Sequence, residues 1–334
     1  IPISDSPELG TFDTTREIEM KKVLYASTAL MLTAGVAAAD VTISGSGRMG
    51  LTYNDAAANN NTQVDYRLRF NVDASKETDA GVKFGGRIRF QNTANSGGQA
   101  SFSAAYVYAE ANGFRVEVGN SNTAYDSSAL MYNSEVGYIG SGGGDPQGSY
   151  FSFSSGGYTA TPNRVGVYVS YSVGDFNVQA SAVDADQTSS VLPVAGPETE
   201  FGMSASYKTG GFTVSAAFVT NGSGISGNDN YFVAGEFAVN DTTNVGLQYF
   251  DNGDTNGVAV GDNGQQVTIY GNTKLASGIT LKGFIANNDA LGNVDETVYG
   301  VGADYDLGGA TLAGSIRTEY NGSTSADLGV SFSF

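Results

Sequence analysis

Hydrophobic and polar residues alternate along most of the chain after residue 40. The apolar face of the first alternating segment carries Val41, Ile43, Gly45, Gly47, Met49, Leu51 and Tyr53. Because successive side chains of a strand point to opposite faces of a sheet, this alternation predicts a β-strand. Ordinary strands average about five or six residues, whereas a strand tilted across a bilayer needs about nine to eleven. The length of the segment therefore predicts a membrane-spanning strand.

The same alternation returns in later segments and continues to the last residue, Phe334. Short connections at 209–211 and 307–309 alternate with longer ones at 184–198 and 251–264. Short turns at one rim and long loops at the other are typical of membrane barrels. Sixteen long segments can be counted from Val41 to the end of the chain. We therefore expect an all-β fold, a sixteen-stranded antiparallel transmembrane β-barrel.

Closure of the sheet decides which side chains meet lipid. An unpaired backbone N–H or C=O in lipid costs several kcal/mol, so a sheet can span a membrane only if it leaves no open edge. The apolar faces must then contact lipid, and the polar faces must line the interior. A soluble β-sandwich or β-solenoid with one wet face is the alternative, and the strand length weighs against it.

The N-terminal region has the features of a secretory signal. Met20 is followed by Lys21 and Lys22, an apolar run, and three alanines that end at Ala39. We expect a signal peptide at 20–39, cleavage between Ala39 and Asp40, and a transmembrane barrel domain at 40–334. Residues 1–19 are acidic and unlike a basic leader, so we interpret them as an overextended N-terminus. The signal peptide and the barrel together predict a location in the bacterial outer membrane.

The composition narrows the chemistry. The chain contains no His and no Cys, which excludes Ser-His-Asp triads, His-ligated zinc and thiol nucleophiles. We therefore expect no enzyme, no catalytic residues and no bound metal. The formal net charge is −18, which argues against nucleic acid as a partner, because phosphates require basic clusters. The Asp-rich stretches at 251–254 and 261–264 suggest calcium only weakly, since they lack EF-hand spacing.

One long segment interrupts the alternation. Residues 120–163 form a loop of more than forty residues that contains Asp126, Glu135, Asp145 and several tyrosines. Loops of this length are usually functional or disordered, and the apolar content here favours a packed loop. Basic residues, by contrast, gather before the loop: eight of the thirteen Lys and Arg that follow residue 39 lie between residues 40 and 115.

Several motifs make the chain similar to a known family. They are Gly47-Arg48-Met49-Gly50 with Tyr53-Asn54, then Ser134-Glu135-Val136-Gly137-Tyr138, then 302–309, 326–330 and the terminal Phe334. The sequence resembles the trimeric general diffusion porins of the Rhodobacter type over essentially its whole length after residue 39. The resemblance implies a homotrimer among outer-membrane lipids and lipopolysaccharide, with a long third loop folded inward to narrow a pore for small hydrophilic solutes and ions.

The resemblance also implies a constriction between basic wall residues and acidic loop residues. The basic candidates are Arg48, Arg67, Arg69, Lys83, Arg87, Arg89 and Arg115. The acidic candidates are Asp126, Glu135 and Asp145. Arginines on neighbouring strands repel one another unless counter-charges or water compensate, and the loop acids are the expected compensation. This loop is less acidic than those of many family members, so strong cation selectivity and calcium sites are not carried over.

Other interpretations stay open at the level of sequence. The arginines could be solvated lumen residues with no selective role. The protein could be a structural or adhesive outer-membrane barrel. It could also be a substrate-specific channel, with a stacked aromatic path built from Tyr125, Tyr132, Tyr138 and Tyr150.

Overall fold

Strands account for nearly all the regular structure in a computed structural model that describes residues 40–94, 96–158, 163–187, 197–255 and 262–334. The strands are β1 (Asp40–Asn54), β2 (Thr62–Glu77), β3 (Lys83–Thr93), β4 (Ser101–Phe102), β5 (Tyr106–Ala111), β6 (Phe114–Gly119), β7 (Val165–Val173), β8 (Phe176–Asp184), β9 (Glu200–Thr209), β10 (Phe212–Thr220), β11 (Asn230–Asn240), β12 (Thr243–Asp251), β13 (Gln265–Lys274), β14 (Ile279–Asn288), β15 (Thr297–Asp306), β16 (Ala310–Thr318) and β17 (Thr324–Ser333). A short 3-10 turn, η1 (Gly222–Gly224), follows β10. In the described part of the chain no helix is long and apolar enough to cross a membrane.

The chain divides into two units, residues 1–40 and residues 41–334. The segments 1–19 and 20–39, for which the sequence predicts an overextended start and a signal peptide, lie outside the described residues. The description that follows concerns the second unit.

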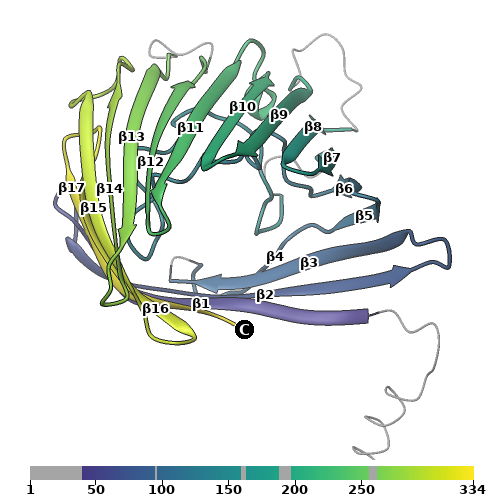
Figure 1. Ribbon diagram of the computed structural model, residues 1–334, viewed down its shortest axis with the longest axis horizontal. Helices are drawn as coiled ribbons and strands as arrows, with labels where there is room; N and C mark the ends of the chain where they lie inside the picture. Colours follow the sequence, from purple (N-terminus) through teal and green to yellow (C-terminus); the bar gives the residue numbers. More distant parts are fainter. Residues whose placement is uncertain (1–39, 95, 159–162, 188–196, 256–261) are drawn as a thin grey trace, which may run out of the picture. The chain divides into compact units, whose positions relative to one another are not determined.

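The strands pair in one antiparallel sheet that closes on itself (Figure 1). Apart from β4 and β5, each strand pairs with the next along the chain, and β1 pairs with β17, where Leu51 lies opposite Leu328. Strands β4 and β5 both pair with β3, so together they form one crossing of the wall. The sheet is therefore the closed sixteen-stranded barrel that the sequence predicts, and each of its described strands has a neighbour on both sides.

The break between β4 and β5 is a bulge. Four positions separate Phe102 from Tyr106, whereas three separate their partners Phe90 and Arg87 on β3. Ser103 bridges the gap, because its N–H donates to the carbonyl of Arg89 (2.8 Å) and its hydroxyl accepts from the Arg89 N–H (2.9 Å). A bulge of this kind bends a strand without leaving its backbone unpaired.

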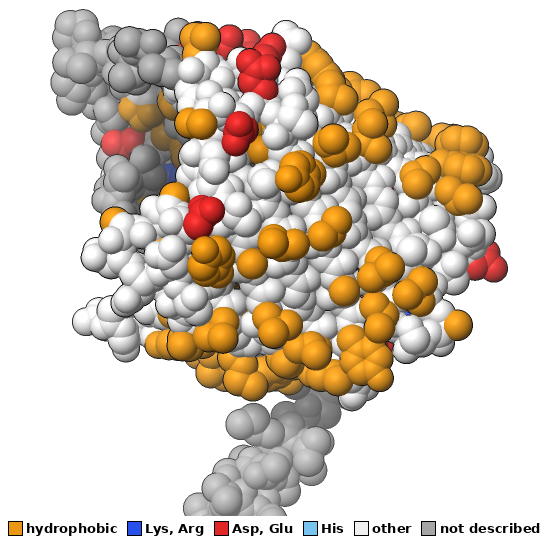
Figure 2. Space-filling model, turned by 90° about the vertical axis from the view of Figure 1, so that its left-hand side faces the viewer, with side chains coloured by type: hydrophobic (Ala, Val, Ile, Leu, Met, Phe, Trp, Pro, Cys, Tyr) orange, Lys and Arg blue, Asp and Glu red, His pale blue; other side chains and the backbone are white. Residues whose placement is uncertain are grey.

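The outer face of the barrel is apolar, as the alternation predicts. Its exposed side chains include Met49, Leu51, Phe201, Met203, Leu247, Leu328 and Phe334. Figure 2 shows apolar side chains spread over one side of this face, with few carboxylates among them. Exposed apolar area on this scale is uncommon on soluble proteins and suits contact with lipid or with other copies of the chain.

Aromatic rings at the end of the chain pack on glycines of β1. Phe334 and Gly45 exchange two backbone hydrogen bonds, of 2.7 and 3.0 Å. The ring of Phe334 covers Gly45 and the ring of Phe332 covers Gly47, where a Cβ atom would collide with the rings. The two glycines thus allow aromatic side chains to pack on the backbone where the barrel closes.

Candidate functional site

Five arginines project from the inner face of the first three strands. We call this set the basic wall: Arg48 on β1, Arg67 and Arg69 on β2, and Arg87 and Arg89 on β3. Their positions have the opposite parity to the exposed apolar residues, so they line the interior. The strand alternation alone therefore brings five of the six predicted arginines to one arc of the barrel interior.

Two arginines of the basic wall are neutralised by carboxylates of the neighbouring strand β2. Arg87 donates to both oxygens of Asp73, at 2.7 Å from Nε and 3.1 Å from Nη2. The Nε of Arg48 lies 3.0 Å from Asp65 Oδ2. This second contact is an ion pair without hydrogen-bond geometry, and Arg48 instead donates through Nη1 to the carbonyl of Ile139 (3.3 Å).

The other three arginines of the basic wall form no ion pair with a carboxylate in the described ranges. Arg69 and Arg89 donate through Nε to the side-chain oxygens of Gln91 (3.0 Å) and Asn71 (2.8 Å). These amides orient the guanidinium groups without neutralising them. Arg67 has no hydrogen-bond acceptor for its buried Nε among the described residues. The basic wall therefore carries an excess of positive charge.

Arg115 and Lys83, the other two basic residues that the sequence suggests for the site, lie outside the basic wall. Arg115 on β6 forms ion pairs with Glu110 (2.6 Å) and Glu117 (2.7 Å), and its guanidinium stacks 3.7 Å from the centre of the Tyr108 ring. Lys83 begins β3 beside the short connection from β2, two positions before Gly85 on the inner face. Neither contributes to the unpaired positive charge of the basic wall.

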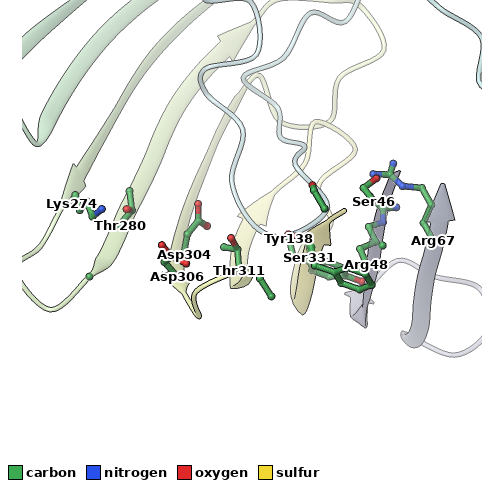
Figure 3. A pocket seen from close by; sticks show the side chains of 16 residues that line it. Ser46, Arg48, Arg67, Tyr138, Lys274, Thr280, Asp304, Asp306, Thr311 and Ser331 are labelled. Carbon is green, nitrogen blue, oxygen red and sulfur yellow. The ribbon is translucent and has the colours of Figure 1, made fainter. Parts of the chain in front are cut away.

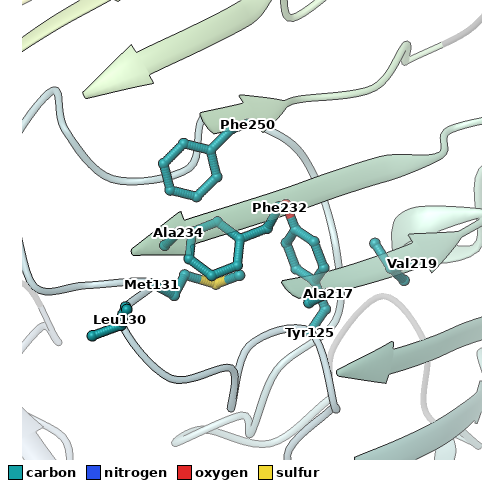
Figure 4. Packing of buried hydrophobic residues seen from close by; sticks show 8 residues of the cluster. All are labelled: Tyr125, Leu130, Met131, Ala217, Val219, Phe232, Ala234 and Phe250. Atoms are coloured by element: carbon teal, nitrogen blue, oxygen red, sulfur yellow. The ribbon is translucent and has the colours of Figure 1, made fainter. Parts of the chain in front are cut away.

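The segment between β6 and β7 contacts a different part of the interior. Tyr125, Leu130 and Met131 of this segment pack with apolar residues of β10, β11 and β12 (Figure 4). Tyr125 and Met131 are fully buried. On the strands, the rings of Phe232 and Phe250 stack 4.9 Å apart. We use the name far wall for the inward-facing apolar set of these strands and the next two: Ala217, Val219, Phe232, Ala234, Phe250, Tyr270 and Phe284.

Hydrogen bonds also fix the same segment to β12, to β17 and to the connection between β16 and β17. The N–H of Tyr138 donates to Asp327 Oδ1 (2.9 Å), and the hydroxyl of Tyr320 donates to the carbonyl of Gly143 (2.9 Å). The amide of Gln248 donates to the carbonyls of Leu130 and Met131. These contacts join residues more than one hundred positions apart, so they fix the segment against the inner face.

Gly137 allows the close approach to Asp327. Its φ of 77° lies in the left-handed region, which favours glycine. A Cβ atom there would collide with the Asp327 carboxylate. That carboxylate also accepts from Arg317 (2.9 Å) and from the Ser315 hydroxyl (2.6 Å), so it ties the segment to β16 and β17.

The three predicted loop acids do not contact the basic wall in the described structure. Asp126 accepts a hydrogen bond from the Tyr132 hydroxyl (2.6 Å). Asp145 accepts from the Gly142 N–H (3.1 Å) and the Ser134 hydroxyl (3.4 Å). The carboxylates that neutralise Arg48 and Arg87 are Asp65 and Asp73 of β2. The negative charge that compensates these two arginines therefore comes from the wall and not from the loop.

Burial shifts the protonation of two loop acids. It raises the pKa of Glu135 to about 7, and the nearby Lys282 ammonium offsets part of the rise. Burial raises the pKa of Asp145 to about 8, and the negative charge of Glu135 adds to the effect. Both carboxyls therefore titrate near neutral pH, which weakens them as fixed counter-charges.

A cavity of about 730 Å³ lies beside the basic wall. Figure 3 shows Arg48 and Arg67 at one end and Asp304 and Asp306 toward the other, with Tyr138 of the long segment between them. Lys274 also lines the end near Asp304, and the Lys282 ammonium lies 2.7 Å from the Asp304 carboxylate, so the negative charge there is partly neutralised. Solutes inside would meet positive and negative groups on different strands.

The residues of the far wall were missed by reasoning from the sequence. They lie at positions that the alternation assigns to the polar inner face. A signal was present, because aromatic residues stand side by side in Tyr231-Phe232 and Tyr249-Phe250, which breaks the period of two. Consecutive apolar residues in a barrel strand indicate that both faces are covered.

The aromatic path considered from the sequence does not form a continuous stacking surface. Tyr125 is fully buried and meets Tyr150 edge-on at 4.7 Å. The Tyr132 hydroxyl bonds to that of Tyr150 (2.8 Å), inside the same packed segment. Of the two Asp-rich stretches, 251–254 and 261–264, only Gly261 lies outside the described residues. Among those described, no group of three or more acidic side chains is arranged to hold a metal ion.

Comparison with known proteins gives one consistent result. A family model described as Gram-negative porin matches residues 26–326. The chain is 36% identical over 302 residues to a porin of Fuscovulum blasticum, and the alignment covers 88% of this chain and 100% of the relative. It is 29% identical over 321 residues to a porin of Rhodobacter capsulatus, again with 88% and 100% coverage.

Solved structures agree with these sequence relatives. The structure of a mutant of the Rh. blastica porin matches with a TM-score of 0.81 at 36% identity. The match covers 88% of this chain and 100% of the solved one. The likeness therefore extends over the whole length of the solved protein.

Proposed function

The chain belongs to the Gram-negative porin family, and on that premise we propose that it forms a water-filled channel for passive diffusion of small hydrophilic solutes and ions across the outer membrane. One observation supports this function above the others: a closed sixteen-stranded sheet is apolar outside and carries unpaired charge inside. A barrel of this size holds an aqueous interior unless something fills it. Family members are channels, and we propose no catalytic role.

We further propose that the segment between β6 and β7 narrows this channel. Its hydrogen bonds to Gln248, Asp327 and Tyr320 support an inward position. The basic wall would then form one side of the constriction, with Arg115 and Lys83 farther from it. Asp126, Glu135 and Asp145 belong to the narrowing segment. Asp306 supplies negative charge beside the cavity, where Asp304 is paired with Lys282.

The surroundings of the barrel follow from its outer face. We propose a homotrimer embedded in lipids and lipopolysaccharide, exported by the signal peptide at 20–39. Exposed apolar residues cover the outer face, which suits lipid on one part and neighbouring subunits on another. Exposed tyrosines such as Tyr53, Tyr171 and Tyr207 suit the interfacial regions, where an aromatic ring with a polar tip is favoured.

The alternatives make different demands on the interior. A structural or adhesive barrel needs no open charged cavity, so the space beside Arg48 and Arg67 favours a channel. A solute-specific channel built on stacked tyrosines would need exposed rings, and the burial of Tyr125 argues against that design.

Recording from planar bilayers tests the proposal. Purified mature protein should insert and conduct in potassium chloride, with current steps in groups of three and a complex that dissociates on heating. Correctly folded protein that inserts but carries no current would contradict the channel. Single current steps from a protein that stays monomeric and is unaffected by heating would agree with the channel function and contradict the homotrimer.

A further inference from the structure

Two arginines of the basic wall converge on a single oxygen atom. The hydroxyl of Ser155 lies 2.8 Å from Arg89 Nη1 and 3.5 Å from Arg69 Nη2, and it accepts from both. The Phe153 ring lies under the same Arg89 guanidinium, at 4.4 Å from its centre. Two guanidinium groups that share one oxygen form the arrangement with which arginines bind an oxyanion.

The third arginine extends this arrangement along the same strand face. Arg67 precedes Arg69 by two positions, so both side chains leave β2 on the inner side. The buried Nε of Arg67 has no acceptor in the described part of the chain, and the residue lines the cavity of about 730 Å³. A charged donor without an acceptor is costly, and an anion entering the cavity would satisfy it.

The charge of the cluster also lacks compensation. Asp65 and Asp73 are already engaged with Arg48 and Arg87. The acceptors for Arg69 and Arg89 are neutral: the amides of Gln91 and Asn71 and the hydroxyl of Ser155. Three like charges held side by side by neutral groups are unfavourable until an anion neutralises them.

We propose that Arg67, Arg69 and Arg89 form a binding site for a doubly charged oxyanion of the phosphate type, either as free phosphate or as the phosphoryl group of a small solute. The site rests on the proposed channel function, because the cavity must be reached from water. A phosphate carries close to two negative charges and several acceptor oxygens, which matches three forked donors better than a single chloride does. The site concentrates such solutes beside the constriction.

The test uses the current through single channels in potassium chloride. Inorganic phosphate added at about pH 7.5, where it carries close to two charges, should reduce the wild-type current in a saturable manner. Glycerol phosphate forms a second arm, which distinguishes a phosphoryl solute from free phosphate. The triple variant Arg67→Gln, Arg69→Gln, Arg89→Gln should need at least about tenfold more of either anion for the same reduction.

Two further variants separate a binding site from general charge. Lys208→Gln removes one positive charge at the exposed end of β9, outside the cluster, and should leave the phosphate effect as in the wild type. Arg67→Gln removes the same charge within the cluster and should weaken the effect about threefold or more. Arg67→Lys keeps the charge but loses the planar fork, so it should resemble Arg67→Gln more than the wild type.

The outcomes distinguish the site from the channel. A wild-type channel that conducts normally but shows no saturable response to phosphate overturns the site and leaves the channel function standing. An equal response in Lys208→Gln and Arg67→Gln also overturns it. Titration calorimetry of phosphate into the folded wild-type protein in detergent gives a readout that requires no variant, and a heat of saturable binding is expected there.

Discussion

The far wall and the basic wall are built from the same kind of strand, yet their inner faces differ. On β10 to β14 the inner face carries Phe232, Phe250 and Phe284, and the segment between β6 and β7 packs on it. On β1 to β3 the inner face carries five arginines, and the same segment touches them through few side chains, among them Phe153 and Ser155.

The difference teaches what positions the long segment. The sequence suggests attraction between loop acids and wall arginines, but the packed contacts are apolar and lie on the other side of the interior. Burial of Met131 stabilises the segment there, by roughly 1.5–3 kcal/mol. The basic wall is consequently left for water and solutes.

The largest expected effect comes from removing the apolar anchor. Phe232→Ala should lower the free energy of unfolding by about 3–5 kcal/mol, because it leaves a cavity beneath Phe250 and Tyr125. Thermal unfolding in detergent measures this. Val233→Ala is the matched control, since its side chain is exposed on the outer face of the same strand. Equal losses of unfolding free energy in the two variants would contradict the conclusion that the far wall holds the segment in place.

The hydrogen bonds of Asp327 to the long segment should contribute less to the free energy of unfolding than the apolar packing of Phe232. Asp327→Asn weakens the bonds to Tyr138 N–H and Arg317, and we expect a loss of about 1.5–3 kcal/mol in unfolding free energy. Noisier single-channel current should accompany it, because the segment loses a tie to β17. Asp306→Asn, at an exposed position of β15, is the control. If Asp327→Asn has wild-type stability and no added current noise, Asp327 does not hold the segment to β17.

Charge in the basic wall should alter ion selectivity by a moderate factor. Arg67→Gln should raise the permeability of potassium relative to chloride roughly threefold, the size expected for one unit charge acting across several ångströms of water. Reversal potentials in a salt gradient measure it. Arg87→Gln combined with Asp73→Asn removes a neutral pair and should leave the ratio unchanged. Identical shifts of the reversal potential in the two variants would show that ion pairing of an arginine with a carboxylate does not affect its contribution to selectivity.

The smallest effect concerns pH. The pKa of Asp145 is raised from its ordinary 3.8 to about 8, so ionisation opposes the packed position of the segment. The associated stability is fully present below about pH 4 and is lost as the pH rises through about 8. Single-channel noise should therefore increase as the pH rises from about 4 to about 8, and Asp145→Asn should flatten the increase. A wild-type channel whose noise is constant over that range would contradict this role.

Much of the barrel could be predicted because lipid imposes a simple rule on strands. Met49, Leu51 and Tyr53 face outward as their spacing requires, and Phe334 closes the sheet on Gly45. The bulge beside Ser103 could not be predicted, since its extra residue is defined only by pairing with β3.

The site was predictable only in part. The period of two places Asp65 and Asp73 on the same face of β2 as the arginines, so neutralisation of Arg48 and Arg87 within the wall was already implicit in the spacing. The burial of Asp145 and Glu135 depends on tertiary packing, which no local pattern records. The pair Tyr231-Phe232 carried a usable signal, because two adjacent aromatics cannot both face lipid.

The most direct test of the contrast between the two walls is the rate at which introduced thiols react inside the channel. The natural chain has no cysteine, so Arg67→Cys and Ser215→Cys each present a single thiol. Ser215 is buried on β10, where its hydroxyl meets that of Ser128 (2.9 Å). A charged water-soluble thiosulfonate should modify position 67 rapidly and position 215 at least about a hundredfold more slowly, as expected for a site that reacts only when the segment opens. Equal rates at the two positions would contradict the account.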